Sequence, residues 1–190
     1  MSEVWDAEAA TFDDEPDHGL RDPTTRAAWL ELLTTHLPSP PARVADLGCA
    51  TGTLSVLLAD AGHIVDAVDF SPAMVERARA KAGERVGVTV ALGDAADPPL
   101  DEAAYDVVLC RHVLWALPDQ AAALQRWVSL LRPGGRLVLV EGRWHTGAGL
   151  SAAQTEDLLR GAGRTPTTYP LTEDVYWGGP VSDERYLVVA

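Results

Sequence analysis

The sequence contains few cysteines and no long apolar segment. Its two cysteines, Cys49 and Cys110, are too few to build a metal cluster alone, and a chain that is not exported keeps them reduced. No segment reaches the roughly 18 uninterrupted apolar residues of a membrane helix. The first residues, Met-Ser-Glu-Val-Trp-Asp, lack the basic and then apolar pattern of a signal peptide. We therefore expect a cytoplasmic protein with no zinc ribbon, no disulfide and no membrane association.

Basic residues are also scarce. The chain has 15 lysines and arginines against 28 acids, a formal net charge of −13. Residues 1–22 carry eight acids and one arginine. A surface of this sign repels phosphate backbones, so nucleic acid is not an expected partner. With 190 residues, 47% of them hydrophobic, the composition predicts a single folded domain over residues 1–190.

From residue 43 onward, short apolar runs alternate with segments of helical periodicity. Alternating strands and helices predict a parallel sheet covered by helices on both faces. The strands are expected at residues 43–48, 64–69, 86–92, 105–110 and 136–141, and the helices at residues 53–61, 71–81 and 119–131.

The two ends of the chain are expected to flank this core. Residues 1–22 show no clear apolar period, and we expect a loop or short helix that packs through Trp5 and Phe12. An amphipathic helix follows from Pro23. The chain thus divides into an N-terminal arm and helix at 1–42, a core at 43–142, and a C-terminal segment at 143–190 with a helix at 151–160 and strands near 167–171 and 185–190.

A glycine-containing turn follows the first predicted strand. Its residues, Gly48-Cys49-Ala50-Thr51-Gly52, are small enough to let a ligand approach the backbone at a helix N-terminus. Asp69 ends the second strand 21 residues after Gly48, where a carboxylate can accept from both hydroxyls of a ribose. Together they indicate a nucleoside-type cofactor. The spacing departs from the G-x-G-x-x-G fingerprint, which disfavours a nicotinamide dehydrogenase.

The segment Asp46-Leu47-Gly48-Cys49-Ala50-Thr51-Gly52 resembles motif I of the class I S-adenosylmethionine-dependent methyltransferases, specifically their compact small-molecule group. Further motifs of this family are matched in order over about residues 43–142. The resemblance implies a doubly wound, Rossmann-like α/β sheet of seven strands with an antiparallel last strand and an N-terminal helical cap. The matching segments are Val68-Asp69-Phe70-Ser71-Pro72-Ala73-Met74, Gly93-Asp94-Ala95-Ala96, Tyr105 to Trp115, and Leu131 to Arg136.

The resemblance implies that S-adenosylmethionine binds at these motifs. Asp69 would hold the ribose, Asp94 the adenine amino group, and Phe70 and Met74 the faces of the adenine. Simpler interpretations are a helix cap for Asp69, a turn cap for Asp94, and core packing for the apolar pair. Asp46 would hold the methionine amine or brace the loop. The full expected set is Asp46, Gly48, Cys49, Ala50, Gly52, Asp69, Phe70, Met74, Asp94, Ala95 and Cys110, although the favoured interpretation of both cysteines is as small core or turn residues.

The residues after the fourth strand are candidates for acceptor chemistry. His112 is the candidate base, because imidazole titrates near neutrality, although a packing role is also open. Arg111 could orient an acidic acceptor or pair with the acidic arm. The Asn/Asp-Pro-Pro-Tyr/Phe motif of the amine-methylating branch is absent here, which argues against DNA bases and glutamine as acceptors. The catechol branch's acidic ligands are absent too, so we expect no metal.

The aromatic residues favour an apolar or aromatic acceptor, because flat rings bury well against indoles. The expected substrate-binding residues are Trp5, Phe12, His18, Arg111, Trp115, Trp144 and Tyr176. The alternatives are packing roles for Trp5, Trp144 and Tyr176 and a solvated loop position for His18. The predicted function is metal-independent methyl transfer to an O, N, S or C atom of a small organic molecule, such as a natural-product intermediate. A non-catalytic S-adenosylmethionine-binding module is the alternative, and RNA or protein methylation is less favoured. The acceptor and the oligomeric state stay open.

Overall fold

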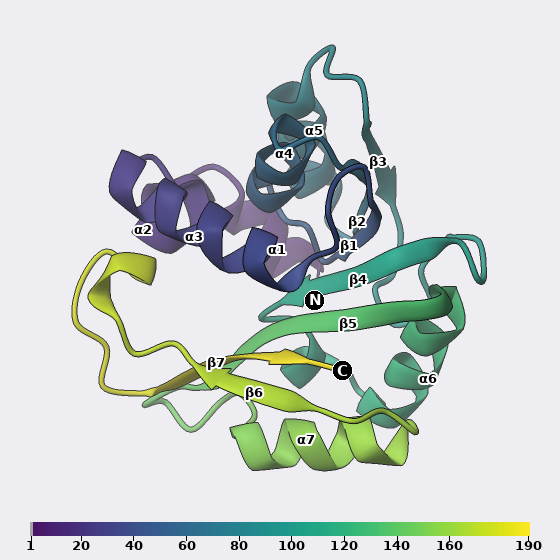
Figure 1. Ribbon diagram of the computed structural model, residues 1–190. Helices are drawn as coiled ribbons and strands as arrows, with labels where there is room; N and C mark the ends of the chain where they lie inside the picture. Colours follow the sequence, from purple (N-terminus) through teal and green to yellow (C-terminus); the bar gives the residue numbers. More distant parts are fainter. Residues whose placement is uncertain (1) are drawn as a thin grey trace.

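The computed structural model describes residues 2–190 as a seven-stranded sheet with helices on both faces (Figure 1). The strand order is β3-β2-β1-β4-β5-β7-β6. Strands β1 to β5 are parallel, whereas β7 runs antiparallel to both β5 and β6. The predicted doubly wound sheet with an antiparallel last strand is confirmed. The strands are β1 (Arg43–Leu47), β2 (Ile64–Asp69), β3 (Val88–Leu92), β4 (Tyr105–Arg111), β5 (Leu131–Arg143), β6 (Thr167–Pro170) and β7 (Glu184–Val189).

Alternate residues of the central strands enter two separate cores. Val107 and Leu109 of β4 pack under α3 and α4, while Val108 and Cys110 pack against α6 and α7. None of the helices described has the length and hydrophobicity to cross a bilayer. The helices are α1 (Ser2–Glu8), α2 (Pro16–Gly19), α3 (Pro23–His36), α4 (Thr53–Asp60), α5 (Pro72–Ala82), α6 (Gln120–Leu130) and α7 (Ala152–Gly161), with 3-10 turns η1 (Phe12–Asp14), η2 (Leu114–Ala116) and η3 (Asp174–Tyr176).

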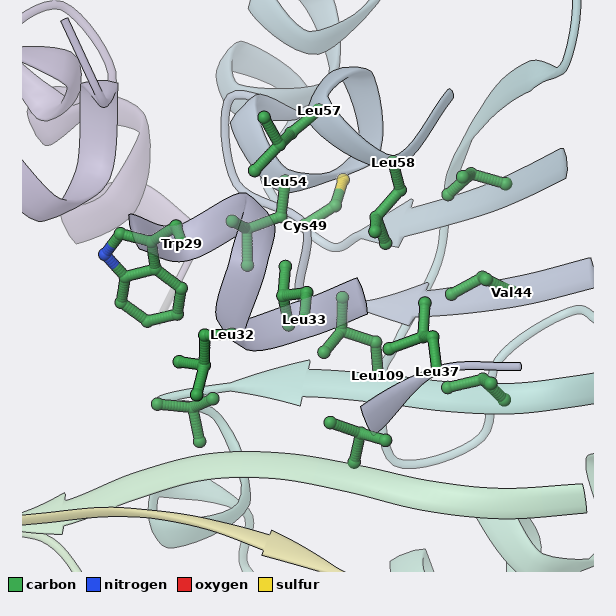
Figure 2. Close-up of a cluster of buried hydrophobic side chains, with 14 of the residues drawn as sticks. Trp29, Leu32, Leu33, Leu37, Val44, Cys49, Leu54, Leu57, Leu58 and Leu109 are labelled. Carbon is green, nitrogen blue, oxygen red and sulfur yellow. The ribbon is translucent and has the colours of Figure 1, made fainter. Parts of the chain in front are cut away.

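Helix α3 fixes the N-terminal cap to the sheet. Trp29 and Leu33 are fully buried, in one hydrophobic cluster with Leu54 of α4 and Leu109 of β4 (Figure 2). Burying one such side chain contributes roughly 1.5–3 kcal/mol. The Trp29 indole also donates to the carbonyl oxygen of Tyr176 at 2.8 Å, which joins α3 to the C-terminal segment.

Local capping explains where the helices near the site begin. The carboxylate of Asp22 accepts from the backbone N–H groups of Thr24 and Thr25 at 2.9 Å, and Pro23 occupies the first turn of α3. The Ser71 hydroxyl accepts from the Met74 N–H at 3.2 Å and starts α5 beside the end of β2.

Three expectations need correction. Residues 2–19 are largely helical, as α1, η1 and α2, rather than a loop or one short helix. β5 starts at 131 instead of 136, because Leu131 already pairs with Tyr105 of β4. β3 starts at 88 instead of 86, because Gly87 takes a φ of +97° that a strand cannot continue through.

Candidate active site

A cavity of about 790 Å³ lies at the carboxyl ends of β1, β2 and β4. Its size is in the usual range for small-molecule sites, roughly 300–1,000 Å³. One half is formed by the β1–α4 turn, the end of β2 and the segment after β3. The other half is formed by the N-terminal arm and the segments after β4 and β5. The lining residues that come from the arm, the end of β4 and the segments after β4 and β5 are Trp5, Phe12, His18, Arg111, His112, Val113, Trp115, Ala116, Leu117, Pro118, Trp144, Thr146 and Ala148.

The β1–α4 turn has left-handed backbone at Gly48, Ala50 and Gly52, with φ values of +71°, +49° and +77°. A Cβ atom on Gly48 would lie 2.3 Å from a methyl group of Val113, so glycine is required there by packing against the loop after β4. Gly52 stands at the N-cap of α4, where a Cβ atom would come within 3.0 Å of Ala78. The turn is therefore specified by close packing as well as by φ.

Asp69 connects the turn to the start of α5. Its two carboxylate oxygens accept from the backbone N–H groups of Ala50 at 2.8 Å and Ser71 at 2.9 Å. The side chain is buried and lines the cavity, and this burial raises the pKa of the carboxyl against the opposing effect of the two N–H donors. Asp69 thus holds the β1–α4 turn and the start of α5 together. Each of its carboxylate oxygens keeps a second lone pair that can accept a hydrogen bond from a ligand.

Asp46 is a second buried carboxyl group in the same half. The Ser55 hydroxyl donates to its Oδ2 at 2.5 Å. Burial raises the pKa of Asp46 to about 6, and the Ser55 hydrogen bond opposes that shift. The group is therefore close to its titration point near neutral pH.

The segment after β3 closes this half. Asp94 is exposed and its Oδ1 accepts from the Ala96 N–H at 2.8 Å, the turn-capping geometry that was the alternative interpretation. Phe70 is 38% exposed and Met74 only 1%, and both side chains line the cavity.

In the other half, Arg111 is the last residue of β4 and His112 follows it. The Arg111 guanidinium lies 5.1 Å from the centre of the Trp29 ring and donates to the backbone oxygen of Asp17 at 2.5 Å. His112 has a φ of +59°, and its ring lies edge-on to Trp144 at 5.2 Å. Its Nε2 is buried without a hydrogen-bond partner among the described residues. Burial, and then Arg111, lower the pKa of His112 well below 6.5.

Glu141 of β5 supports the loop that carries His112. Its Oε1 accepts from the backbone N–H groups of Val113 at 3.1 Å and Leu114 at 2.8 Å. The side chain is fully buried, and this burial raises the pKa of its carboxyl to about 8. The raised pKa favours the neutral acid at pH 7, and the second carboxyl oxygen, Oε2, is buried without a hydrogen-bond partner among the described residues.

Aromatic rings wall the same half. The Trp115 indole donates to the His112 carbonyl at 2.9 Å and lies 5.3 Å from the ring of Trp144. Phe12 stacks on His18 with ring centres 4.2 Å apart. These rings give the cavity flat apolar walls next to a few polar groups.

Most of the predicted site residues meet at this cavity. Three do not line it: Gly52, which packs on α5; Cys110, which points into the core under α6; and Tyr176, whose turn packs on Trp29 outside the cavity. The residues that do line it are Asp46, Gly48, Cys49, Ala50, Asp69, Phe70, Met74, Asp94, Ala95, Trp5, Phe12, His18, Arg111, His112, Trp115 and Trp144.

Sequence reasoning missed several contributors. Lys81 is the only lysine of the sequence, but no neighbouring residue indicates that it contacts the β1–α4 turn. Asp17 stood among eight acids of the arm, and Glu141 was hidden within a strand pattern. Their roles depend on contacts between distant segments.

Comparison with known proteins identifies the family. A model described as "Methyltransferase domain" matches residues 45–139. The chain belongs to the class I S-adenosylmethionine-dependent methyltransferases. A ubiquinone biosynthesis O-methyltransferase of Xanthomonas euvesicatoria is 36% identical over 140 residues, which are 71% of this chain and 54% of that protein. The chain thus spans about half the length of the curated relatives it matches.

Solved structures of methyltransferases share the fold. Magnesium protoporphyrin IX methyltransferase of Synechocystis, with S-adenosylmethionine bound, superposes with a TM-score of 0.68 at 26% identity, covering 87% of this chain and 77% of that one. The [4+2]-cyclase SpnF gives a TM-score of 0.73 at 20% identity, covering 85% and 78%. Because one of these structures is a cyclase, the fold alone does not define the reaction.

The residues present fit the family's cofactor. S-adenosylmethionine offers three kinds of hydrogen-bond donor: an ammonium, ribose hydroxyls and an adenine amino group. The cofactor half of the cavity offers three carboxylates, Asp46, Asp69 and Asp94, and none of its lining residues is lysine or arginine. A dinucleotide pyrophosphate would be repelled by three carboxylates, against one basic side chain that lines the cavity, Arg111, which lies near Asp46.

Proposed function

We propose that this chain catalyses methyl transfer from S-adenosylmethionine to a small, planar organic acceptor. The observation that carries the proposal is a single cavity joining a half lined by carboxylates to a half walled by Phe12, Trp115 and Trp144. The cofactor supplies a methyl group already activated on a sulfonium, so much of the catalysis comes from positioning the acceptor. The family membership and the O-methyltransferase relative support this assignment.

Different residues of the chain would bind the cofactor and the acceptor. Asp69 and Asp94 would orient the nucleoside, and Asp46 would face the amino acid part. The rings after β4 and β5 would exclude water and hold the acceptor flat. We propose no metal for this reaction, and a natural-product intermediate is a suitable class of acceptor.

A turnover assay tests the proposal. The purified protein is incubated with methyl-labelled S-adenosylmethionine and a panel of hydroxylated, amino and carboxylated aromatic compounds, after treatment with a chelator. Transfer of label to at least one acceptor, with release of S-adenosylhomocysteine, is expected. Tight cofactor binding without turnover across the panel would instead favour the non-catalytic binding module.

A further inference from the structure

The short turn η2 after β4 is capped from a distant strand. Its N-cap residue, Val113, offers no side-chain acceptor to the turn. The backbone N–H groups of Val113 and Leu114 donate instead to Oε1 of Glu141 on β5, at 3.1 Å and 2.8 Å, over separations of 28 and 27 residues. The carboxyl group of Glu141 therefore does for η2 what a serine or aspartate does locally at the start of other helices.

The loop after β4 accounts for the presence of a carboxyl group in this core. Glu141 is fully buried, and within residues 2–190 its side-chain hydrogen bonds come from that loop while Oε2 has no partner. An apolar side chain of similar size would be easier to bury. It would leave the N–H groups of Val113 and Leu114 without an acceptor, which is costly for a buried donor.

The backbone kink at the start of the loop is held from β5 on both sides. His112 takes a left-handed φ of +59°, which a residue with a Cβ atom adopts only where its surroundings hold it. The His112 N–H donates to the carbonyl oxygen of Val140 at 2.9 Å. The next two N–H groups donate to Glu141, the residue that follows Val140. Adjacent residues of β5 thus fix the direction in which the chain leaves β4.

This direction determines one wall of the cavity. Leu114 is fully buried in the core beside α6 and anchors the loop from below. The Trp115 indole donates to the carbonyl of His112 at 2.9 Å, which ties the wall back to the kink. The loop residues that line the cavity are His112, Val113, Trp115, Ala116, Leu117 and Pro118.

The same loop contacts the β1–α4 turn. A Cβ atom on Gly48 would lie 2.3 Å from Cγ2 of Val113, so this methyl group packs directly on the glycine. On the β2 side, the Gly48 N–H donates to the carbonyl oxygen of Val68 at 2.8 Å. The first glycine of the cofactor turn is therefore held between β2 and the loop that Glu141 caps.

We propose that Glu141 is a positioning residue for the cofactor: by holding the N–H groups of Val113 and Leu114, it keeps Val113 packed on Gly48 and so maintains the shape of the turn that binds S-adenosylmethionine. Glu141 does not line the cavity and acts only through Val113. This inference rests on the cofactor site of the proposed function. It adds a third support to that turn, besides Asp69 and the close packing of Gly52.

Replacing Glu141 tests the proposal through the affinity for S-adenosylhomocysteine, measured by calorimetry. Glu141→Leu should weaken binding about tenfold, because the loop loses its acceptor and Val113 is no longer held on Gly48. Glu141→Gln should bind within about twofold of the wild type, since its amide oxygen can accept from the same two N–H groups. Burial favours the neutral acid at this position, so the uncharged amide is a close substitute.

A double-mutant cycle tests whether Glu141 acts through Val113. Val113→Ala removes the methyl groups that pack on Gly48 and should weaken binding by a similar factor. The double variant with Glu141→Leu should bind about as well as the weaker of the two single variants, because both changes remove one support. Independent, multiplying losses would show that Glu141 does not act through this contact, and would overturn the proposal.

Tyr186→Phe is the matched control. Tyr186 pairs directly with Glu141 across β5 and β7 and is equally buried, but its hydroxyl bonds to Thr155 at 2.6 Å and to the Leu150 carbonyl at 3.1 Å rather than to the loop. This variant should lower the melting temperature and leave the affinity unchanged. If folded Glu141→Leu behaves in the same way, Glu141 only stabilises the core and the proposal fails. Binding by Glu141→Gln as weak as by Glu141→Leu would also overturn it.

Hydrogen exchange tests the link without any substitution. If the position of the loop determines cofactor affinity, bound S-adenosylhomocysteine must stabilise the loop by the same free energy. Exchange of the Val113 and Leu114 amides should therefore slow when wild-type protein is saturated with this compound. Unchanged exchange would overturn the proposal even if Glu141→Leu does not fold. The proposed function fails separately, when the wild type binds S-adenosylhomocysteine but transfers no methyl group in the turnover assay.

Discussion

Lys81 of α5 forms an ion pair with Asp13 of the N-terminal arm, with 2.8 Å between Nζ and Oδ2. The same ammonium donates to the hydroxyls of Thr51 at 2.9 Å and Thr53 at 2.6 Å. Thr51 in turn donates to Asp13 at 2.5 Å. One partly buried lysine thus ties the acidic arm to the turn that starts the cofactor half of the cavity.

Replacing Lys81 tests this connection. Lys81→Met should lower the free energy of unfolding by about 1–3 kcal/mol, the range for losing hydrogen bonds to a charged group. It should also speed proteolysis in the arm before Trp29. Denaturant unfolding and limited proteolysis measure the two effects. Arg160→Met is the control, because its ion pairs with Glu156 and Asp157 are exposed and local, and a loss equal to that of Lys81→Met would contradict the account.

The arm should also respond to the cofactor. We predict that S-adenosylhomocysteine slows cleavage before Trp29, because Trp5 and Phe12 line the cavity and would be held by a bound ligand. Proteolysis with and without the ligand measures this. Equal cleavage in both states would show that the arm does not close over the site.

Asp69→Ala should weaken cofactor binding by about 1–3 kcal/mol, with about tenfold for each 1.4 kcal/mol. The variant loses the acceptor for the ribose and also the brace on Ala50 and Ser71. Calorimetry with S-adenosylhomocysteine measures the affinity. Asp97→Ala is the control, because its exposed carboxylate pairs with Arg126 away from the cavity. Unchanged affinity in folded Asp69→Ala would remove Asp69 from the ribose site.

Cofactor binding should weaken as the pH falls through about 6. The pKa of Asp46 is raised to about 6 by burial, and only its ionised form can attract the ammonium of the amino acid part. Binding is measured by calorimetry at several pH values. Asp46→Asn should bind the cofactor more weakly at neutral pH, and its affinity should not change over the same pH interval. A wild-type affinity for the cofactor that does not change with pH would show that Asp46 has a purely structural role.

The raised pKa of Glu141 predicts that the free energy of unfolding depends on pH. Below pH 4.5 the carboxyl is protonated in the folded and the unfolded chain. Between 4.5 and about 8, only the unfolded chain releases the proton, so the free energy of unfolding should fall as pH rises. Glu141→Gln keeps an oxygen for the Val113 and Leu114 N–H groups, and it should make the free energy of unfolding less dependent on pH over this interval. Denaturant unfolding across that interval gives the slope, and identical slopes for wild type and variant would refute the assignment.

The order of strands and helices could be predicted from the sequence because it depends on local patterns. Apolar runs at 43–47, 64–69 and 105–111 alternate with capped helices, and Pro23 and Pro72 mark two helix starts. The motif residues Asp46 and Asp69 reach the cavity for the same reason, since the carboxyl ends of parallel strands share one edge.

The acceptor half could not be predicted in the same way. Asp17 meets Arg111 only through the docking of the arm, and no periodicity encodes that contact. Tyr176 was expected at the site by its aromatic character, but it packs on Trp29, while its neighbour Trp177 stacks on His112 at 6.0 Å. Neither of these neighbouring rings lines the cavity, because both pack on Trp29 in the core under α3, and sequence alone does not fix that packing.

The central claim is tested most directly by titrating the purified protein with S-adenosylmethionine, S-adenosylhomocysteine and nicotinamide dinucleotide in parallel in a calorimeter. The carboxylate-lined half predicts micromolar binding of the first two, about −8 kcal/mol, and no measurable binding of the dinucleotide. Absence of binding by both adenosyl compounds in a folded sample, or preference for the dinucleotide, would contradict the account.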